Sequence, residues 1–349
     1  MFNIDNVILL ILASIFLSII LSWFSIKIAP KIDLMDIPNS ADHKKHPSPV
    51  PLTGGIVLID LIIIMVFLTG LWKDPKIFGV LLSGIIISIF GLLDDLVNLS
   101  PLKKFIGQIM ASIILIYFGT QINFFNSPEF FYHTESKLDF WLNILFTILW
   151  LVTLANAFNF IDSIDGLVLG ISGLSTACFL VMSISTGQEN LVYFCSILLG
   201  VCIGIYFFNA FPAKLFLGDS GAQTLGFILA SVAIVFRPDS GSQSSTWFAP
   251  VLLFYVPLFD LILVVVSRIR RKKRIYKASK DHTYHRLVSM GFSKQHAVLL
   301  LHGICLCMSM IGYLCLNLPV ANANTIFLFS ILLGASAIVK LENEFNSYV

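Results

Sequence analysis

Charged residues are scarce in this sequence. Only 12% of its 349 residues are Asp, Glu, Lys or Arg, whereas 57% are hydrophobic. Soluble domains carry about 25% charged residues, so the composition excludes a water-soluble fold. The formal net charge of +2 is too small to indicate a nucleic-acid partner. We therefore expect a membrane protein that does not bind nucleic acid.

Motifs for disulfides and zinc are also missing. The cysteines lie in apolar runs without CxxC or Cys/His spacing; they are Cys178, Cys195, Cys202, Cys305, Cys307 and Cys315. We interpret them as small buried hydrophobic residues. The first apolar run continues into Lys27 and Lys31 without a small-residue cleavage pattern. We expect this run to be a membrane anchor, not a cleaved signal peptide.

Long apolar runs recur along the whole chain. A helix that crosses the hydrocarbon core of a membrane needs about 20 mostly apolar residues. On this criterion the sequence predicts about eleven spans, near 7–28, 52–71, 77–93, 105–120, 140–157, 166–186, 191–210, 221–236, 247–267, 296–317 and 322–339. We find no soluble domain, linker or internal repeat between them. The prediction is an all-α, polytopic integral membrane protein with a single membrane-embedded domain over residues 1–349.

Lysine and arginine residues favour one side of the predicted spans. Cytoplasmic loops carry the excess of these residues in membrane proteins. One side holds most of them, including the basic run between 268 and 294, while the other side holds only Lys73, Lys76, Lys137 and Arg237. The pattern predicts an outside N-terminus and a cytoplasmic C-terminus. It also places the loops near 30–51, 94–104, 156–166, 209–220 and 268–294 in the cytoplasm.

The loop over 156–166 is rich in oxygen ligands. It has no lysine or arginine to balance its carboxylates, and Asn159, Asp162 and Asp165 follow one another at spacing i, i+3, i+6. A helical turn would align these side chains along one edge. Such an edge offers ligands for Mg²⁺ or Mn²⁺, or acceptors for a nucleoside. Acidic residues at a membrane usually mark a functional site.

Two further loops carry carboxylates. Asp94 and Asp95 follow the third predicted span directly. Neighbouring carboxylates repel each other, and a nearby metal ion or a proton to be transferred would explain why they stand together. A solvated helix end is the alternative. Lys104 and Gln108 share one helix face that suits a phosphate. Asp219 lies beside a glycine just before a predicted helix. In that position it can serve as a metal ligand, as part of the N-cap of the helix, or as both.

Basic and aromatic residues complete the pattern. The segment that contains His46 and ends in Gly54-Gly55 suits an anionic ligand, or forms an ordinary cytoplasmic turn. His282 and His285 share a helix edge and suit a diphosphate better than zinc. The roles of Asp60 and Asp260 stay open. Together the loops predict a cytoplasm-facing, metal-dependent site for phosphoryl transfer to a lipid.

Five motifs in fixed order carry a resemblance to a known family. They are HPSPVPLTGG, DDLVNLSPLKKFIGQ, NAFNFIDSIDG, FNAFPAKLFLGDSG and the late DHTYHR loop. The chain resembles the polyprenyl-phosphate N-acetylhexosamine-1-phosphate transferases over nearly its whole length. It looks more similar to the initiators of common antigen, O-antigen and wall teichoic acid than to the phospho-MurNAc-pentapeptide translocase, which has ten spans.

The resemblance implies a role for each motif residue. Asp219, with Asn159, would bind Mg²⁺, for which Mn²⁺ is a substitute. The implied catalytic residues are Asp94, Asp95, Asp162 and Asp165, the first two of which would assist the lipid phosphate. The implied substrate-binding residues are His46, Lys104, Gln108, Asn156, Asn209, Phe216, His282, His285 and Arg286. Of these, Asn209 and Phe216 would contact uridine, and Lys104, His282 and His285 would contact phosphate.

The implied reaction moves N-acetylhexosamine-1-phosphate from a UDP-sugar to undecaprenyl phosphate in the bacterial inner membrane. GlcNAc is the first choice of sugar, and a homodimer is an option in this family. Tyr284 replaces a family histidine, and DSIDG replaces the usual DGLDG, so QuiNAc and FucNAc stay open. The alternatives are UDP-MurNAc-pentapeptide as donor, an ion-coupled transporter, or an inactive scaffold. The transporter is disfavoured because transporter sites lie near the midplane, often between repeats.

Overall fold

The computed structural model describes residues 3–38, 48–123, 137–237, 243–273 and 281–346. The chain divides into two compact units. The first comprises Met1–Ile122 and Trp141–Arg237, and the second comprises Asn123–Phe140 and Pro238–Val349. The single domain over residues 1–349 stays a prediction.

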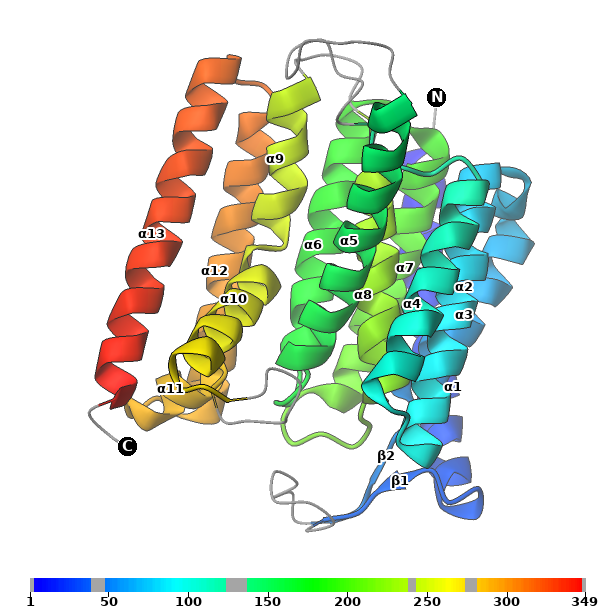
Figure 1. The fold of residues 1–349 in the computed structure, drawn as a ribbon. Helices are drawn as coiled ribbons and strands as arrows, with labels where there is room; N and C mark the ends of the chain where they lie inside the picture. Colours follow the sequence, from blue (N-terminus) through cyan, green and yellow to red (C-terminus); the bar gives the residue numbers. More distant parts are fainter. Residues whose placement is uncertain (1–2, 39–47, 124–136, 238–242, 274–280, 347–349) are drawn as a thin grey trace. The chain divides into compact units, whose positions relative to one another are not determined.

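The first unit is built almost entirely of helices. They are α1 (Ile4–Ile28), α2 (Gly54–Thr69), α3 (Pro75–Val97), α4 (Pro101–Tyr117), most of α5 (Lys137–Ile161), α6 (Leu167–Ser185), α7 (Glu189–Asn209) and α8 (Gly218–Val235). Figure 1 shows them side by side. Helix α8 packs against α2, α3 and α6 and is buried over nearly its whole length. The start of α8 is therefore surrounded by other elements of the unit.

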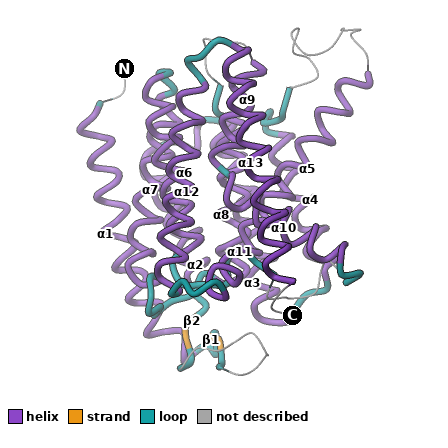
Figure 2. Tube along the Cα trace, turned by 90° about the vertical axis from the view of Figure 1, so that its left-hand side faces the viewer, coloured by secondary structure: helices purple, strands orange, loops and turns teal. Residues whose placement is uncertain are grey.

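A short antiparallel pair of strands lies at one end of this unit. Strand β1 (Met35–Asp36) pairs with β2 (Val50–Pro51), with Met35 opposite Pro51. Figure 2 shows the pair beyond the ends of the helices. Because α2 begins three residues after β2, the pair holds the segment that enters α2 in an extended conformation.

The second unit contains α9 (Gln243–Leu253), α10 (Tyr255–Arg270), α11 (Thr283–Ser289), α12 (Lys294–Cys315) and α13 (Val320–Asn346). The predicted ninth span, 247–267, is therefore not one continuous helix. Pro257 has no N–H to donate to the carbonyl of Leu253, four residues earlier. The thiol of Cys305 lies 3.9 Å from that carbonyl oxygen and takes the place of the missing donor.

Eight helices within the described residues are long and apolar enough to cross a membrane. They are α1, α3, α5, α6, α7, α8, α12 and α13. Helix α2 is apolar but has only 16 residues, and α4 has 17. The helical fold and the multi-pass architecture are thus confirmed. The count of eleven spans and the sides on which the ends lie stay predictions.

Helix α1 packs closely against α7 because two glycines leave room for its backbone. A Cβ atom added to Gly204 would lie 1.7 Å from Ser18 Oγ and 2.8 Å from the Ile15 carbonyl oxygen. A Cβ added to Gly200 would lie 2.5 Å from the carbonyl oxygen of Ile11. The two glycines therefore serve helix packing, as small residues spaced four apart commonly do in membranes.

We expect Gly204→Ala to lower the melting temperature of the purified protein. Alanine normally favours a helix over glycine, but here it forces α1 away from α7, and such overpacking costs about 1–3 kcal/mol. Gly303→Ala in α12 is the matched control, because a Cβ there meets no atom within 4 Å. Equal melting temperatures for both variants would contradict this account of α1 packing.

Candidate active site

The loop before α8 is paired with the entrance to α2. The Phe216 N–H donates to the Pro51 carbonyl oxygen at 2.8 Å, and the Gly54 and Gly55 N–H groups donate to the carbonyls of Phe216 and Leu217 at 3.0 Å each. A Cβ on Gly55 would lie 2.4 Å from the Gly221 nitrogen. The glycines of the first predicted motif thus allow two backbones to meet, and they set the position of the fourth motif.

Asp95 caps the start of α8 from another helix. Its Oδ1 accepts from the Asp219 N–H at 2.8 Å, and its Oδ2 accepts from the Ser220 N–H at 3.1 Å. The first amides of a helix have no partner within the helix and carry partial positive charge. Gly218 has φ +70°, and a Cβ there would lie 2.6 Å from Asp95 Oδ2. Asp95 at the end of α3 therefore holds Asp219 in place.

Lys104 bridges two of the predicted carboxylates. Its Nζ donates to Asp219 Oδ2 at 2.8 Å and also forms an ion pair with Asp94 Oδ2. Asp94 Oδ1 accepts from the Leu99 N–H at 2.7 Å, so this side chain also fixes the turn between α3 and α4. Asn159 hydrogen-bonds to Asp219, and Asp94 shares the Lys104 ammonium with it. Asp219 is thus the point at which α3, α4, α5 and α8 meet.

A row of carboxamide side chains extends from Asp219 into the first unit. Gln108 Nε2 donates to Gln223 Oε1 at 3.0 Å, and Asn156 Nδ2 donates to Gln108 Oε1 at 2.9 Å. Gln223 Nε2 lies 3.5 Å from Asp219 Oδ2. Gln223 was not among the predicted residues, although it follows Asp219 by four positions and so shares its face of α8. The row holds Gln108 and Asn156 beside the carboxylates.

Asp165 and Asn209 join the two loops that flank α6 and α7. Asp165 Oδ2 accepts from the Ala213 N–H at 2.9 Å. Asn209 Oδ1 accepts from the Gly166 N–H at 3.1 Å, and its Nδ2 donates to the Leu215 carbonyl at 2.9 Å. Asn209 is only 3% exposed. These contacts give both residues a role in loop geometry, and their contacts with a nucleotide stay predictions.

The pKa of Asp162 reflects its burial and the negative charges around it. The side chain is half-buried, and burial, followed by the charges of Asp219, Asp95 and Asp165, raises its pKa to about 8. Asp162 is therefore largely protonated at neutral pH, and a cation bound beside it would lower its pKa and favour loss of the proton.

The oxygen atoms of Asp219 and Asn159 fit a Mg²⁺ ion that is bound by few protein ligands. No group of three His, Cys, Asp or Glu side chains in the described parts of the chain is arranged to hold a metal ion. Mg²⁺ keeps several waters, however, and binds through one or two carboxylates together with substrate phosphates. Asp219, with the Asn159 carboxamide beside it, matches that requirement. The assignment of Mg²⁺ to these two residues stays a prediction.

The remaining predicted residues lie outside the cluster around Asp219. His46 lies outside the described residues. Phe216 is half-buried in the loop before α8, in the first unit. His282, His285 and Arg286 lie in the second unit, at the start of α11. The structure thus brings ten of the predicted residues together in the first unit besides Phe216: Asp94, Asp95, Lys104, Gln108, Asn156, Asn159, Asp162, Asp165, Asn209 and Asp219.

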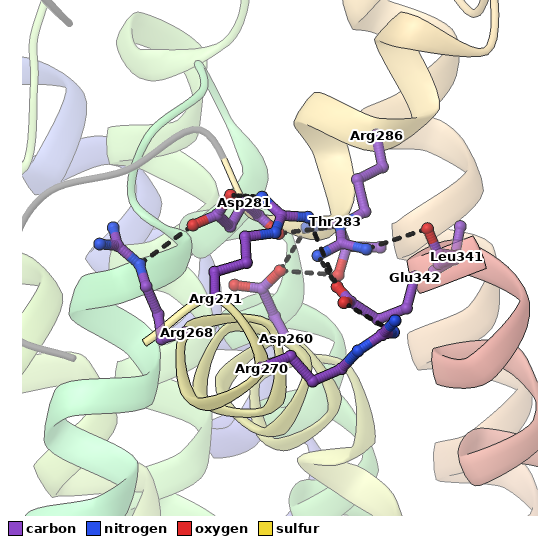
Figure 3. Close-up of polar contacts among 9 residues, drawn as sticks. All are labelled: Asp260, Arg268, Arg270, Arg271, Asp281, Thr283, Arg286, Leu341 and Glu342. Carbon is purple, nitrogen blue, oxygen red and sulfur yellow. Dashed lines mark hydrogen bonds and ion pairs between the residues drawn. The ribbon is translucent and has the colours of Figure 1, made fainter. Parts of the chain in front are cut away.

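Arg286 makes structural contacts in the second unit. It is 1% exposed, and its Nη2 donates to Glu342 Oε1 at 2.5 Å. Its Nη1 donates to the Leu341 carbonyl and its Nε to the Asp281 carbonyl, each at 3.0 Å. Figure 3 shows these contacts between α11 and the end of α13. They fasten α11 in place, so contact of Arg286 with a substrate stays a prediction without support from its described partners.

Fold and site together define a multi-pass helical membrane protein with a carboxylate-rich site at the ends of its helices. Residues 77–237 match the family described as Glycosyl transferase family 4. This range contains all the predicted residues from Asp94 to Asp219.

Named relatives cover most of the chain. It is 30% identical over 276 residues to a probable undecaprenyl-phosphate N-acetylglucosaminyl 1-phosphate transferase of Bacillus subtilis, covering 79% of this chain and 75% of that protein. It is 30% identical over 302 residues to a decaprenyl-phosphate N-acetylglucosaminephosphotransferase of Mycobacterium leprae, with the same coverage. A phospho-N-acetylmuramoyl-pentapeptide-transferase of Lacticaseibacillus paracasei is 30% identical over 271 residues, 72% of this chain and 79% of that protein. The chain belongs to glycosyl transferase family 4, and the resemblance seen in the motifs is confirmed.

Proposed function

We propose that this protein transfers an N-acetylhexosamine-1-phosphate, with GlcNAc-1-phosphate as the first choice, from a UDP-sugar to undecaprenyl phosphate. The products are the lipid-linked sugar diphosphate and UMP. The reaction would start the synthesis of O-antigen or another envelope polysaccharide at the cytoplasmic face of the bacterial inner membrane. The names of the relatives from Bacillus subtilis and Mycobacterium leprae support the reaction type.

One observation carries the proposal. Asp219 lies where four helices meet, with Lys104 Nζ at 2.8 Å, with Asn159 in hydrogen-bonding contact, and with Asp94 on the same ammonium. Catalysis of phosphoryl transfer depends chiefly on the alignment of the reactants and on neutralisation of phosphate charge. A lysine, a carboxamide and an excess of carboxylates at one point provide the groups for both tasks. An uncharged helix end would provide neither.

The bond changes follow from the two substrates. An oxygen of the lipid phosphate forms a bond to the β-phosphorus of the UDP-sugar, and the bond from that phosphorus to the UMP oxygen breaks. The anomeric C–O bond is not broken, so its configuration is retained. Mg²⁺ at Asp219 and Asn159 would supply charge neutralisation on the diphosphate. The ammonium of Lys104 would add charge neutralisation of its own, and Asp94 and Asp219 hold that ammonium in place.

Proton transfer has a minor part in this scheme. A phosphate monoester has a second pKa of about 6 and is already largely ionised at neutral pH. A general base at Asp94 or Asp95 therefore contributes less than alignment does. This expectation agrees with the contacts of Asp95, both of whose oxygens accept hydrogen bonds from the backbone of α8.

The test is UMP release by the purified protein with undecaprenyl phosphate and Mg²⁺. The donor panel contains the UDP forms of GlcNAc, QuiNAc, FucNAc and MurNAc-pentapeptide. We expect release that requires both lipid and metal, with UDP-GlcNAc the best donor. Folded protein that binds a UDP-sugar but releases no UMP with any donor would contradict the proposal and favour the transporter alternative. Release only with UDP-MurNAc-pentapeptide would keep the reaction and change the donor.

A further inference from the structure

Gln223 is a buried carboxamide beside Asp219 that lies outside all five motifs. It belongs to α8, follows Asp219 by four positions, and is 3% exposed. Its Oε1 accepts from Gln108 Nε2 at 3.0 Å. Its Nε2 lies 3.5 Å from Asp219 Oδ2, the oxygen that also accepts from Lys104. Gln223 thus faces the carboxylate on which the proposed function depends.

The contact between Gln223 and Asp219 is longer than the usual hydrogen-bond distance of about 2.9–3.0 Å. Its effect therefore depends on which end of the carboxamide faces the carboxylate. An NH₂ group attracts the carboxylate, whereas a carbonyl oxygen repels it. The two ends have nearly the same shape, so packing alone does not choose between them. The hydrogen bonds at the other end of the side chain must make the choice.

Those hydrogen bonds begin at a backbone carbonyl in α5. Asn156 Nδ2 donates to the Val152 carbonyl oxygen at 2.7 Å and to Gln108 Oε1 at 2.9 Å. A carbonyl accepts hydrogen bonds and donates none, so the NH₂ group of Asn156 must point this way. Gln108 then turns its oxygen to Asn156 and its NH₂ group to Gln223. The oxygen of Gln223 is thereby engaged, and its NH₂ group faces Asp219.

The carboxylate at the other end of the row requires the same direction. Asp219, when ionised, also accepts and donates none, so each carboxamide donates toward α8. Reversal of a single carboxamide would bring two oxygens or two NH₂ groups together. Gln108 is 2% exposed, and a buried polar group without a suitable partner is costly. The row of Asn156, Gln108 and Gln223 therefore has one favoured orientation.

We propose that Gln223 is a positioning residue for Asp219: its NH₂ group, oriented by the row of carboxamides, fixes the carboxylate for the cation that neutralises the sugar diphosphate. This inference rests on the proposed function. Gln223 touches no substrate in this scheme and acts only through Asp219. Partners that orient a metal-binding side chain typically contribute about 10–100-fold in metal affinity or activity.

Gln223→Met tests the contact in the purified full chain. Methionine is also long and unbranched, but it has no N–H to offer Asp219. We expect kcat/KM for UMP release to fall about tenfold, and the Kd for Mn²⁺, used alone as the probe of the cation site, to rise about tenfold. Asp219→Asn, measured alongside, identifies the Mn²⁺ binding that depends on Asp219. An unchanged Kd for Mn²⁺ in Gln223→Met would overturn the proposal, whatever the value of kcat/KM.

Ser231→Ala is the matched control for loss of a buried polar group from α8. Ser231 is fully buried, and its Oγ donates to the Phe227 carbonyl oxygen at 2.7 Å, about three helical turns beyond Asp219. We expect wild-type kcat/KM and Kd for Mn²⁺, even if the melting temperature falls. A loss of Mn²⁺ affinity equal to that of Gln223→Met would assign the effect to folding and overturn the proposal. If Gln223→Met does not fold, Gln223→Leu takes its place.

A double-mutant cycle of Gln223→Met with Asn156→Leu tests the row. Asn156→Leu removes the NH₂ group that orients Gln108. Mn²⁺ binding is measured without donor or lipid, so a contact between Asn156 and substrate does not enter. We expect Asn156→Leu to weaken Mn²⁺ binding when Gln223 is present and to cause no further loss when methionine replaces it. Losses that are additive in free energy would overturn the proposal, because Asn156 would then act independently of Gln223.

Failure of the proposed function gives a different result. Wild-type protein that releases no UMP with any donor contradicts transfer, and the Mn²⁺ measurements then decide the inference. Weaker Mn²⁺ binding by both Asp219→Asn and Gln223→Met would still support the role of Gln223. Mn²⁺ binding that either substitution leaves unchanged would overturn it, whether or not the protein transfers a sugar phosphate.

Discussion

Asp219→Asn is expected to lower kcat/KM for sugar-phosphate transfer by about a thousandfold, equivalent to about 4 kcal/mol of transition-state stabilisation. The substitution keeps the size of the side chain but removes its charge. Lys104 Nζ, 2.8 Å away, then loses one of its two carboxylate partners. The protein also loses the carboxylate that we propose as a ligand of Mg²⁺. Both changes act on groups that we propose to contact the diphosphate.

UMP release and thermal unfolding measured on the same preparations check this expectation. We expect the melting temperature to change little, because asparagine retains an oxygen for Lys104 and the α8 backbone is held by Asp95. Asp5→Asn is the control for removal of a carboxylate, since Asp5 is exposed in the first turn of α1. Near-wild-type transfer by Asp219→Asn would contradict the assignment of Asp219 as a metal ligand. A loss of activity in proportion to a loss of folded protein would show that its role is structural.

The carboxylate site could be predicted from the sequence because its residue types are unusual in a membrane. Asp94, Asp162 and Asp219 stand out against apolar surroundings, and a bilayer tolerates such residues only for a reason. Hydropathy and lysine placement predict that they lie on one face of the membrane. The structure places them in one cluster with Lys104.

Residues whose partners lie far along the chain could not be assigned in the same way. Arg286 is predicted from the sequence to bind substrate, and that role stays a prediction; its buried contact with Glu342, 56 positions later, is a structural role that the sequence did not indicate. Asp95 resembles its neighbour Asp94, yet its partners are backbone amides 124 and 125 positions away. Local sequence reports residue type and spacing, whereas these roles depend on tertiary contacts.

The span count shows a second limit. Hydropathy merges α9 and α10 into one span because both are apolar, and Pro257 breaks the helix without changing that average. Helices α2 and α4, with 16 and 17 residues, fall just below the length expected for a full crossing. Length and composition therefore identify the long helices well and leave the short ones undecided.

Asp95→Ala is expected to lower both stability and activity. The substitution removes two hydrogen bonds between a carboxylate and the first amides of α8, and bonds to charged groups contribute about 1.5–3 kcal/mol each. The start of α8 carries Asp219, and a displacement of about 1 Å at a reacting centre can cost about a hundredfold in rate. We therefore expect kcat to fall by about a hundredfold, together with a clear drop in melting temperature.

Comparison with Asp95→Asn separates the two roles open to this residue. If Asp95 positions α8, asparagine retains one acceptor and restores part of kcat and part of the melting temperature. If Asp95 is the general base for the lipid phosphate, asparagine is as inactive as alanine, because neither side chain accepts the proton. Equal kcat values for the two variants, at the full stability of Asp95→Asn, would therefore contradict the positioning role.

Gly218→Ala should displace the start of α8 without changing any carboxylate. It leaves every carboxylate in place but adds a Cβ that would lie 2.6 Å from Asp95 Oδ2, at a residue with φ +70°. The methyl group must push the cap away from α8, so kcat and melting temperature should fall in the direction seen for Asp95→Ala. A base at Asp95 would keep its chemistry in this variant. A shared loss in Asp95→Ala and Gly218→Ala, partly relieved in Asp95→Asn, is thus the pattern that only the positioning role produces.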